Sequence, residues 1–248
     1  MTTQQIVLVL VLAVTAGLIK STSGFGYPLL LVPIFSQFME FVDAVLLVAP
    51  SNLFLNVAIV WRLREKRHDA ATLKSFTGFG VVGAIVGTLL LPWLPPNVAR
   101  SLLLVVLSIF LYSRLKGIRY EFSDRDAQRY APIAGSLAGV CQGAIGVSGP
   151  IVTPWFLSLD RGRDVFVFSV AFTFGITGLV QVAVAGINNL YTATTLAVGL
   201  GIIPLVALTV PVGARIRQRI STDAFQKFVI ALLTVSGLAL LLRVLGVT

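Results

Sequence analysis

An apolar N-terminal segment is interrupted by the stretch Ala16-Gly17-Leu18-Ile19-Lys20-Ser21-Thr22-Ser23-Gly24-Phe25-Gly26-Tyr27-Pro28. Its glycines and hydroxyl side chains break the helical pattern and leave backbone N–H and C=O groups without helical partners. Hydrocarbon tolerates such groups where they line a cavity inside the protein. The stretch therefore predicts a polar binding site within a membrane protein.

The composition is that of a protein that crosses the membrane several times. Hydrophobic residues make up 56% of the 248 residues, charged residues 12%, and the mean hydropathy is +0.94. Soluble domains carry about 25% charged residues, and a helical span needs about 18 apolar residues or more. Apolar runs near that length recur along the chain. We predict an all-α integral membrane protein with a single transmembrane domain over residues 1–248.

The charge and the rarer residues exclude several classes of protein. The formal net charge is +9, but the basic residues form short clusters at predicted helix ends, which is typical of membrane proteins and unlike the continuous face of a nucleic-acid binder. Cys141 is the single cysteine and His68 the single histidine, so no disulfide, Cys-rich or His-based metal site, or Ser-His triad can form within the chain. We predict no enzyme, no catalytic residue, no cofactor, no metal and no nucleic-acid partner. Residues 1–5 lack a basic side chain, so no cleaved signal peptide is expected.

The second half of the chain repeats the glycine and proline positions of the first half. An internal repeat of this kind changes the interpretation of the whole fold. We predict two repeats, one over about residues 5–114 and one over about residues 131–245. The matched positions, 121 to 126 residues apart, are Ala16-Gly17 with Ala138-Gly139, Gly24 with Gly146, Pro28 with Pro150, Asp43 with Asp164, and Gly87 with Gly213.

Charge decides the orientation of the two halves. Four full spans in each half would make the halves parallel and place the basic clusters on both sides, against the positive-inside tendency. A broken or re-entrant helical hairpin followed by three transmembrane helices would invert the second half. In that arrangement sixteen basic residues lie inside and two, Arg100 and Arg243, lie outside. We therefore predict two inverted repeats in the cytoplasmic (inner) membrane, with basic loops in the cytoplasm and both termini outside.

The lengths of the apolar segments leave one question open. A first arm over residues 6–19 would extend roughly 20 Å, most of the hydrocarbon core, so an arm that crosses the membrane completely stays an alternative to a re-entrant one. The expected full spans are Val42 to Trp61, Phe76 to Trp93, Val98 to Tyr112, Val165 to Ile187, Thr194 to Val212 and Ala224 to Leu245.

Both hairpin tips have the pattern of a helix N-terminus. Gly24 and Gly26 permit backbone conformations that other residues avoid, and Pro28 suits the first turn of a new helix. The stretch Gly146 to Pro150 repeats this pattern. The return arms would point unsatisfied N–H groups and a positive dipole end at the tips. We predict an anion site near mid-membrane, between the two tips.

Polar side chains near the tips are candidates for this site. A cation at the bilayer centre costs about 2.5–3.5 kcal/mol and is functional or paired, so Lys20 either serves the site, pairs with Asp43 or Glu40, or extends to an interface. Small polar residues in the spans either line the site or pack helices, and no carboxylate lies in the middle of a span. The run Gly83 to Gly87 indicates close helix packing. The predicted substrate-binding residues are Lys20, Ser21, Thr22, Ser23, Gly24, Phe25, Gly26, Asn52, Asn56, Gln142, Gly146, Val147, Ser148, Gly149, Thr173 and Thr177.

At its two tips the chain resembles the TauE/SafE family of membrane permeases, sometimes called sulfite exporters. The resemblance covers essentially the whole chain and departs from the family pattern at Tyr27 and Ser148, where a further glycine is common. It implies transport of sulfite or organosulfonates. The residues that carry it are Ala16-Gly17 through Gly26 with Pro28 and Pro33, Ala138-Gly139 through Gly149 with Pro150 and Pro154, Gly83 to Gly87, and Leu94-Pro95-Pro96.

From these features we predict a secondary transporter that moves a small sulfur-containing oxyanion, sulfite or an organosulfonate, across the cytoplasmic membrane by alternating access. Two alternatives stay open. One is a transporter of another small anion, such as a carboxylate, sulfate or thiosulfate, and the other is a membrane assembly protein without transport activity. The expected partners are a small anionic substrate and membrane lipid, and the sequence leaves a coupling ion and a homo-oligomer open.

Overall fold

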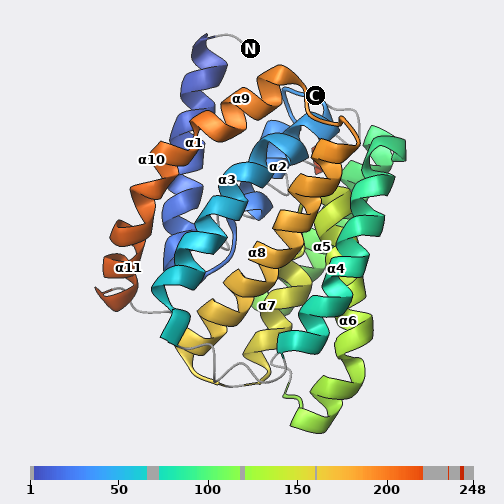
Figure 1. Ribbon diagram of the computed structural model, residues 1–248, viewed down its shortest axis with the longest axis vertical. Helices are drawn as coiled ribbons and strands as arrows, with labels where there is room; N and C mark the ends of the chain where they lie inside the picture. Colours follow the sequence, from blue (N-terminus) through green and yellow to red (C-terminus); the bar gives the residue numbers. More distant parts are fainter. Residues whose placement is uncertain are drawn as a thin grey trace.

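The computed structural model describes residues 3–65, 73–117, 121–159, 161–219, 234 and 241–242, and their regular structure is entirely helical (Figure 1). This confirms the predicted all-α fold. The helices are α1 (Thr3–Ser23), α2 (Tyr27–Phe35), α3 (Phe41–Arg62), α4 (Leu73–Leu90), the 3-10 turn η2 (Leu91–Trp93), α5 (Pro96–Leu115), α6 (Asp124–Ile145), α7 (Gly149–Leu157), α8 (Arg163–Ile187), α9 (Ala193–Gly201), α10 (Ile203–Ala207) and α11 (Thr209–Arg219).

Four stretches of the described chain are long and apolar enough to cross a bilayer. They are α3, α4 together with η2, α5 over Pro96–Ser113, and α8. A fifth span results if the bent pair formed by α9–α10 and α11 counts as one. These lengths and compositions confirm a multi-pass membrane protein.

The expected span from Thr194 to Val212 is not one straight helix. The structure divides it into α9, α10 and α11, with a bend of 45° between Ala193–Ala207 and Thr209–Ile216. Pro204 lies in the first turn of α10 and has no backbone N–H to continue the ladder from α9, which ends at Gly201. The last expected span, from Ala224 to Leu245, lies outside the described residues except for positions 234 and 241–242.

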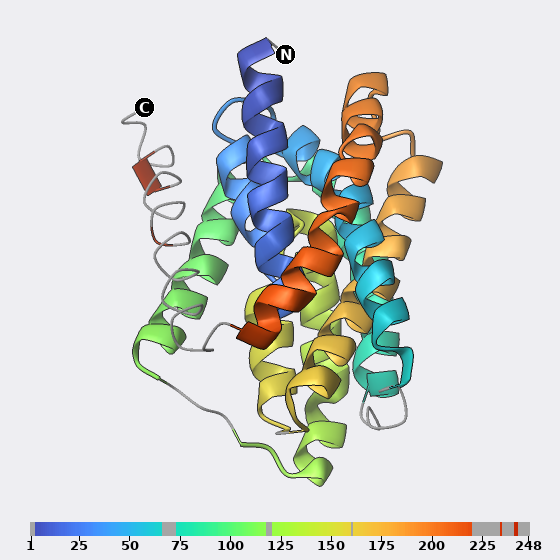
Figure 2. The same ribbon diagram turned by 90° about the vertical axis from the view of Figure 1, so that its left-hand side faces the viewer.

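Two pairs of a long and a short helix form the expected broken hairpins. α1 has 21 residues and α6 has 22, and each is followed by a helix of nine residues, α2 or α7. Gly24, Gly26 and Gly146 have φ values of 87°, 106° and 70°, in the left-handed region that glycine occupies without strain. In Figure 2, α1 descends from the top of the bundle and α6 rises from the bottom. The relation of the complete halves as inverted repeats stays a prediction.

The long arms reach past the middle of the bundle. A Cβ atom at Gly24 would lie 3.3 Å from the side chain of Val167, the fifth residue of α8, and one at Gly146 would lie 3.1 Å from Val45, the fifth residue of α3. At 1.5 Å per residue, both contact points are about 6 Å from the beginning of those helices. Each first arm therefore crosses most of the bundle, and its short partner returns part of the way.

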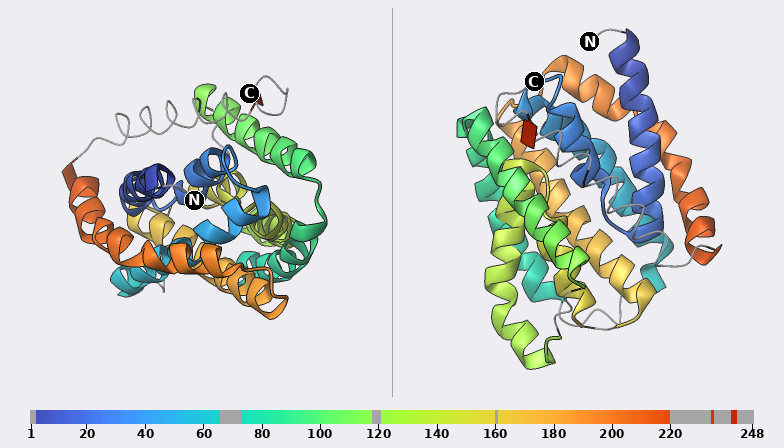
Figure 3. Two further views of the ribbon diagram at one scale, coloured as in Figure 1. Left: turned by 90° about the horizontal axis from the view of Figure 1, so that it is seen from above. Right: turned by 180° about the vertical axis from the view of Figure 1, so that it is seen from behind.

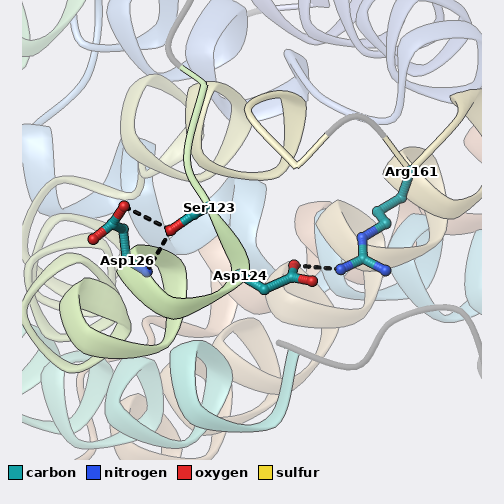
Figure 4. A network of polar contacts seen from close by, with 4 residues as sticks. All are labelled: Ser123, Asp124, Asp126 and Arg161. Atoms are coloured by element: carbon teal, nitrogen blue, oxygen red, sulfur yellow. Dashed lines mark hydrogen bonds and ion pairs between the residues drawn. The ribbon is translucent and has the colours of Figure 1, made fainter.

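The helix ends that carry the basic clusters gather at one end of the bundle. The ends of α3 and α5 and the beginnings of α4, α6 and α8 lie in the lower half of Figures 1 and 2. There Arg161 pairs with Asp124, and Ser123 accepts a hydrogen bond from the N–H of Asp126 at the start of α6 (Figure 4). An arrangement with four full spans in each half would place these basic clusters at opposite ends of the bundle. In the structure they lie at the same end. The side of the membrane that this end faces stays a prediction.

The long arm of each hairpin packs on a helix from the other half. On one side of the bundle, α6 contacts α4 so closely that a Cβ at Gly83 would lie 2.1 Å from the carbonyl oxygen of Ser136. On the other side, α1 contacts α11 at Gly17 and Gly213 (Figure 3, left). The close helix packing predicted for the run Gly83 to Gly87 is confirmed.

Candidate functional site

A small cavity lies where the two hairpin tips meet the long spans α3 and α8. Asn52 is the twelfth of the 22 residues of α3, and Phe174 is the twelfth of the 25 residues of α8, so the cavity is at mid-length of both. It has room for about one water molecule. Its lining residues are Gly26, Pro28, Leu29, Asn52, Gln142, Val147, Ser148, Gly149 and Phe174.

Two helix N-termini open onto this cavity. Gly26 is the N-cap of α2 and Ser148 the N-cap of α7, and a proline follows in the first turn of each helix. The first N–H groups of a helix have no intrahelical acceptor, and the helix dipole makes this end positive. Both features favour an anion in the cavity.

Lys20 lies beside the cavity, buried within the protein. Its side chain is 0% exposed, and its Nζ lies 5.0 Å from the centre of the Phe174 ring, which also lines the cavity. Among the described residues, Nζ has no hydrogen-bond acceptor and no ion-pair partner. Neither Asp43, in the first turn of α3, nor the exposed Glu40 pairs with it. The alternatives in which Lys20 pairs with Asp43 or Glu40 or extends to an interface are therefore wrong.

Gln142, the repeat counterpart of Lys20, makes hydrogen bonds through both polar atoms of its side chain. Its Oε1 accepts from Ser148 Oγ at 2.8 Å, and its Nε2 donates to Gln181 Oε1 at 2.9 Å. Gln181 Nε2 in turn donates to the backbone carbonyl of Gln142 at 2.9 Å. This network fixes the side chains of the second tip in the wall of the cavity.

Two asparagines of α3 contrast with this network. Asn52 and Asn56 are 2% and 0% exposed, and the Oδ1 of Asn52 and both amide atoms of Asn56 have no hydrogen-bond partner in the described structure. A Cβ added at Gly175 would lie 3.6 Å from the Cβ of Asn56, which places Asn56 against α8 next to Phe174. Buried polar groups are nearly always paired, so the unpaired groups near Phe174 call for a ligand or water.

The hydroxyl groups of Ser21, Thr22 and Ser23 on the first arm bond to partners outside the cavity. Ser21 Oγ lies 3.4 Å from Thr209 Oγ1, and Thr22 Oγ1 donates to the carbonyl oxygens of Leu18 and Gly213. Ser23 Oγ donates to the carbonyl oxygens of Ile19 and Phe25, which shapes the turn. These contacts give Ser21 and Thr22 a packing role against α11.

The hydroxyl groups of Thr173 and Thr177 on α8 also have hydrogen-bond partners within the protein. Thr173 Oγ1 is 3.0 Å from Thr77 Oγ1 of α4, and Thr177 Oγ1 donates to the carbonyl oxygen of Thr173 at 2.8 Å. Neither residue lines the cavity. Their predicted role in substrate binding stays untested.

The cavity brings together part of the predicted set with Pro28, Leu29 and Phe174, which were not predicted, and Gln181 supports its wall through Gln142. The sequence did not indicate a role for Phe174, because a phenylalanine in an apolar helix, two residues after Phe172, does not differ from an ordinary packing residue. The sequence did indicate Gln181, because it continues the four-residue spacing of Thr173 and Thr177 along one helical face. The predicted residues in the lining are Gly26, Asn52, Gln142, Val147, Ser148 and Gly149; Phe25, Gly24 and Gly146 shape or flank the turns outside it.

These features define the class of protein, a multi-pass helical membrane protein with two broken hairpins around a central cavity. Discontinuous helices of this kind are typical of transporters. The family model "Sulfite exporter TauE/SafE" matches residues 9–240, and the chain belongs to this family. The family comprises membrane transporters of sulfur-containing anions and is not one of enzymes. Comparisons with curated proteins and with solved structures gave no significant match.

Proposed function

We propose that the chain is a secondary transporter of a small sulfur-containing oxyanion, sulfite or an organosulfonate, and that the cavity between the hairpin tips is its substrate site. The observation that carries the proposal is Lys20, a fully buried basic side chain that has no acidic partner in the described part of the chain. It lies beside a cavity onto which two helix N-termini open. The family membership supports the sulfur chemistry, and the charge arrangement supports an anion.

Transport requires the site to open to each side in turn. With room for about one water molecule, the cavity is too small for a sulfur oxyanion, so the tips must separate for substrate to enter. Because the arms enter from opposite ends of the bundle, movement of one arm exposes the site to one side. We place the protein in the cytoplasmic membrane, with the basic end inside and both termini outside.

Uptake by the purified protein in liposomes tests this function. The substrates are sulfite, methanesulfonate, sulfate, thiosulfate and a short carboxylate, each at the same concentration. We expect sulfite or methanesulfonate to be taken up fastest. Faster uptake of sulfate, thiosulfate or the carboxylate would favour a transporter of another small anion. No uptake, together with no change in thermal stability on adding any anion, would favour an assembly protein.

Two variants test the site itself. A hydrogen bond to a charged group contributes about 1.5–3 kcal/mol, so Lys20→Ala should lower uptake roughly tenfold or more, and Ser148→Ala should act in the same direction. The matched controls are Lys74→Ala, at an exposed position in the first turn of α4, and Ser36→Ala, a buried serine that donates to the Pro33 carbonyl. Full activity of Lys20→Ala combined with Ser148→Ala would show that the site lies elsewhere.

A further inference from the structure

The surroundings of Lys20 do not stabilise an ammonium ion. Nζ is enclosed, and no carboxylate, carbonyl or hydroxyl of the described chain accepts a hydrogen bond from it. Burying an ammonium group costs several kcal/mol, whereas the contact with the Phe174 ring contributes about 0.5–2 kcal/mol. The aromatic contact does not offset the lost hydration, so the neutral amine is favoured before an anion binds.

The charged groups on the helices around Lys20 lie towards the helix ends. The helices next to α1 are α2, α3, α10 and α11, and Phe174 brings α8 into contact. Tyr27, the titratable residue in α2, shares a hydrogen bond of 2.9 Å with Ser51. The charged residues of these helices are Asp43 and Arg62 in α3, Arg163 and Asp164 in α8, and Arg215, Arg217 and Arg219 in α11.

We propose that Lys20 couples transport to protons: each anion binds together with one proton, which Lys20 holds, and the two are released together. The neutral Nζ amine takes up H⁺ as the anion arrives, and an ammonium–anion pair forms. For a monovalent anion the site is electrically neutral before and after binding. This inference rests on the proposed function, and it makes the transporter an electroneutral proton–anion symporter.

Lysine suits this role better than arginine. A guanidinium group stays protonated in proteins, whereas a buried lysine exchanges its proton readily. Lys20→Arg should therefore keep an attraction for the anion but lose the proton. Lys20→Met should lose both.

Methanesulfonate is the probe that tests the coupling. A sulfonate stays ionised at neutral pH, so a proton that accompanies it must travel on the protein, whereas sulfite can carry its own. Liposomes contain a pH-sensitive dye, and uptake is measured with an imposed pH gradient and, separately, with an imposed membrane potential. We expect one proton per methanesulfonate in the wild type, acceleration by an inward proton gradient and no response to the potential.

Substitution of Lys20 should remove the proton coupling. Uptake by Lys20→Arg should move no protons and should respond to the membrane potential, and Lys74→Arg, the matched control, should behave as the wild type. Wild-type uptake of methanesulfonate without protons would overturn the coupling and leave the proposed function intact. Proton movement that persists in Lys20→Met would also overturn it. A wild type that takes up no anion at all would overturn the proposed function, and this inference with it.

Discussion

A Cβ atom on Gly139 of α6 would lie 2.0 Å from the carbonyl oxygen of Gly80 in α4. The backbones of the two helices are therefore in direct contact. Gly135 and Gly143, one turn to either side of Gly139, make equally close approaches to α4. In a membrane, helix association depends on such packing because lipid provides little hydrophobic drive between helices. The contact holds the long arm of the second hairpin in place.

Gly139→Ala should destabilise the protein, because the new methyl group forces α4 and α6 apart. Overpacking of this kind costs about 1–3 kcal/mol. Gly78→Ala is the matched control on α4, since a Cβ there meets no atom within 4 Å and alanine favours the helix. Thermal unfolding in detergent should give a lower midpoint for Gly139→Ala and an equal or higher one for Gly78→Ala. Equal midpoints for Gly139→Ala and the wild type would contradict the packing.

Gln181→Leu should disturb the second tip from a distance. The change removes two hydrogen bonds to Gln142 and leaves its buried Nε2 without the acceptor on Gln181, at a cost of about 1–3 kcal/mol. Because Gln142 accepts from Ser148 in the cavity wall, we also expect a higher KM for anion uptake. A double-mutant cycle with Gln142→Leu measures the coupling. Strictly additive effects on stability would show that the pair does not act as a unit.

Phe174→Leu should weaken anion uptake by removing the ring that contacts Lys20 and lines the cavity. A cation–π contact of about 0.5–2 kcal/mol corresponds to a change of roughly 2- to 30-fold in apparent affinity. Phe172→Leu is the matched control, because Phe172 stacks on Phe168 on another side of α8. Saturation curves of uptake distinguish the two. A larger effect at Phe172 would place the substrate elsewhere.

A disulfide between α1 and α11 should stop transport. A Cβ at Gly17 would lie 3.5 Å from the Cβ of Thr209, within the range for a disulfide, so Gly17→Cys with Thr209→Cys should cross-link on oxidation in a Cys141→Ser background. Uptake by the double variant should fall on oxidation and recover with reductant, whereas oxidation should not change the uptake of either single variant. Undiminished uptake by the cross-linked protein would show that the first hairpin does not move relative to α11 during transport.

Labelling of single introduced cysteines should reveal the orientation in the membrane. Arg64, Arg161 and Asn188 are exposed, the first two at the basic end and the third at the other end of α8. In a Cys141→Ser background, a membrane-impermeant thiol reagent applied outside cells should label Asn188→Cys. It should modify Arg64→Cys and Arg161→Cys only after the membrane is permeabilised. Labelling of Arg64→Cys and Arg161→Cys from opposite sides would refute the common basic end.

The sequence by itself determined the membrane class, the positions of both helix breaks and the family. These features depend on local properties. Apolar segment length decides whether a helix can span the bilayer, and the glycines at 24, 26 and 146 have few alternatives where the backbone requires positive φ. The proposal of an anion also came from the sequence, because a helix begins after each tip.

Only the tertiary structure decided which polar residues meet. Lys20 and Gln142 are equivalent by sequence offset. Among the described residues, Nζ of Lys20 has no hydrogen-bond partner, whereas Gln142 takes part in three hydrogen bonds, because different helices pack on them. Phe174 lines the cavity and contacts Lys20 of α1 through the packing of distant segments, which no spacing within α8 encodes. Helical periodicity shows which residues share a face, but the neighbour of that face depends on packing between distant segments.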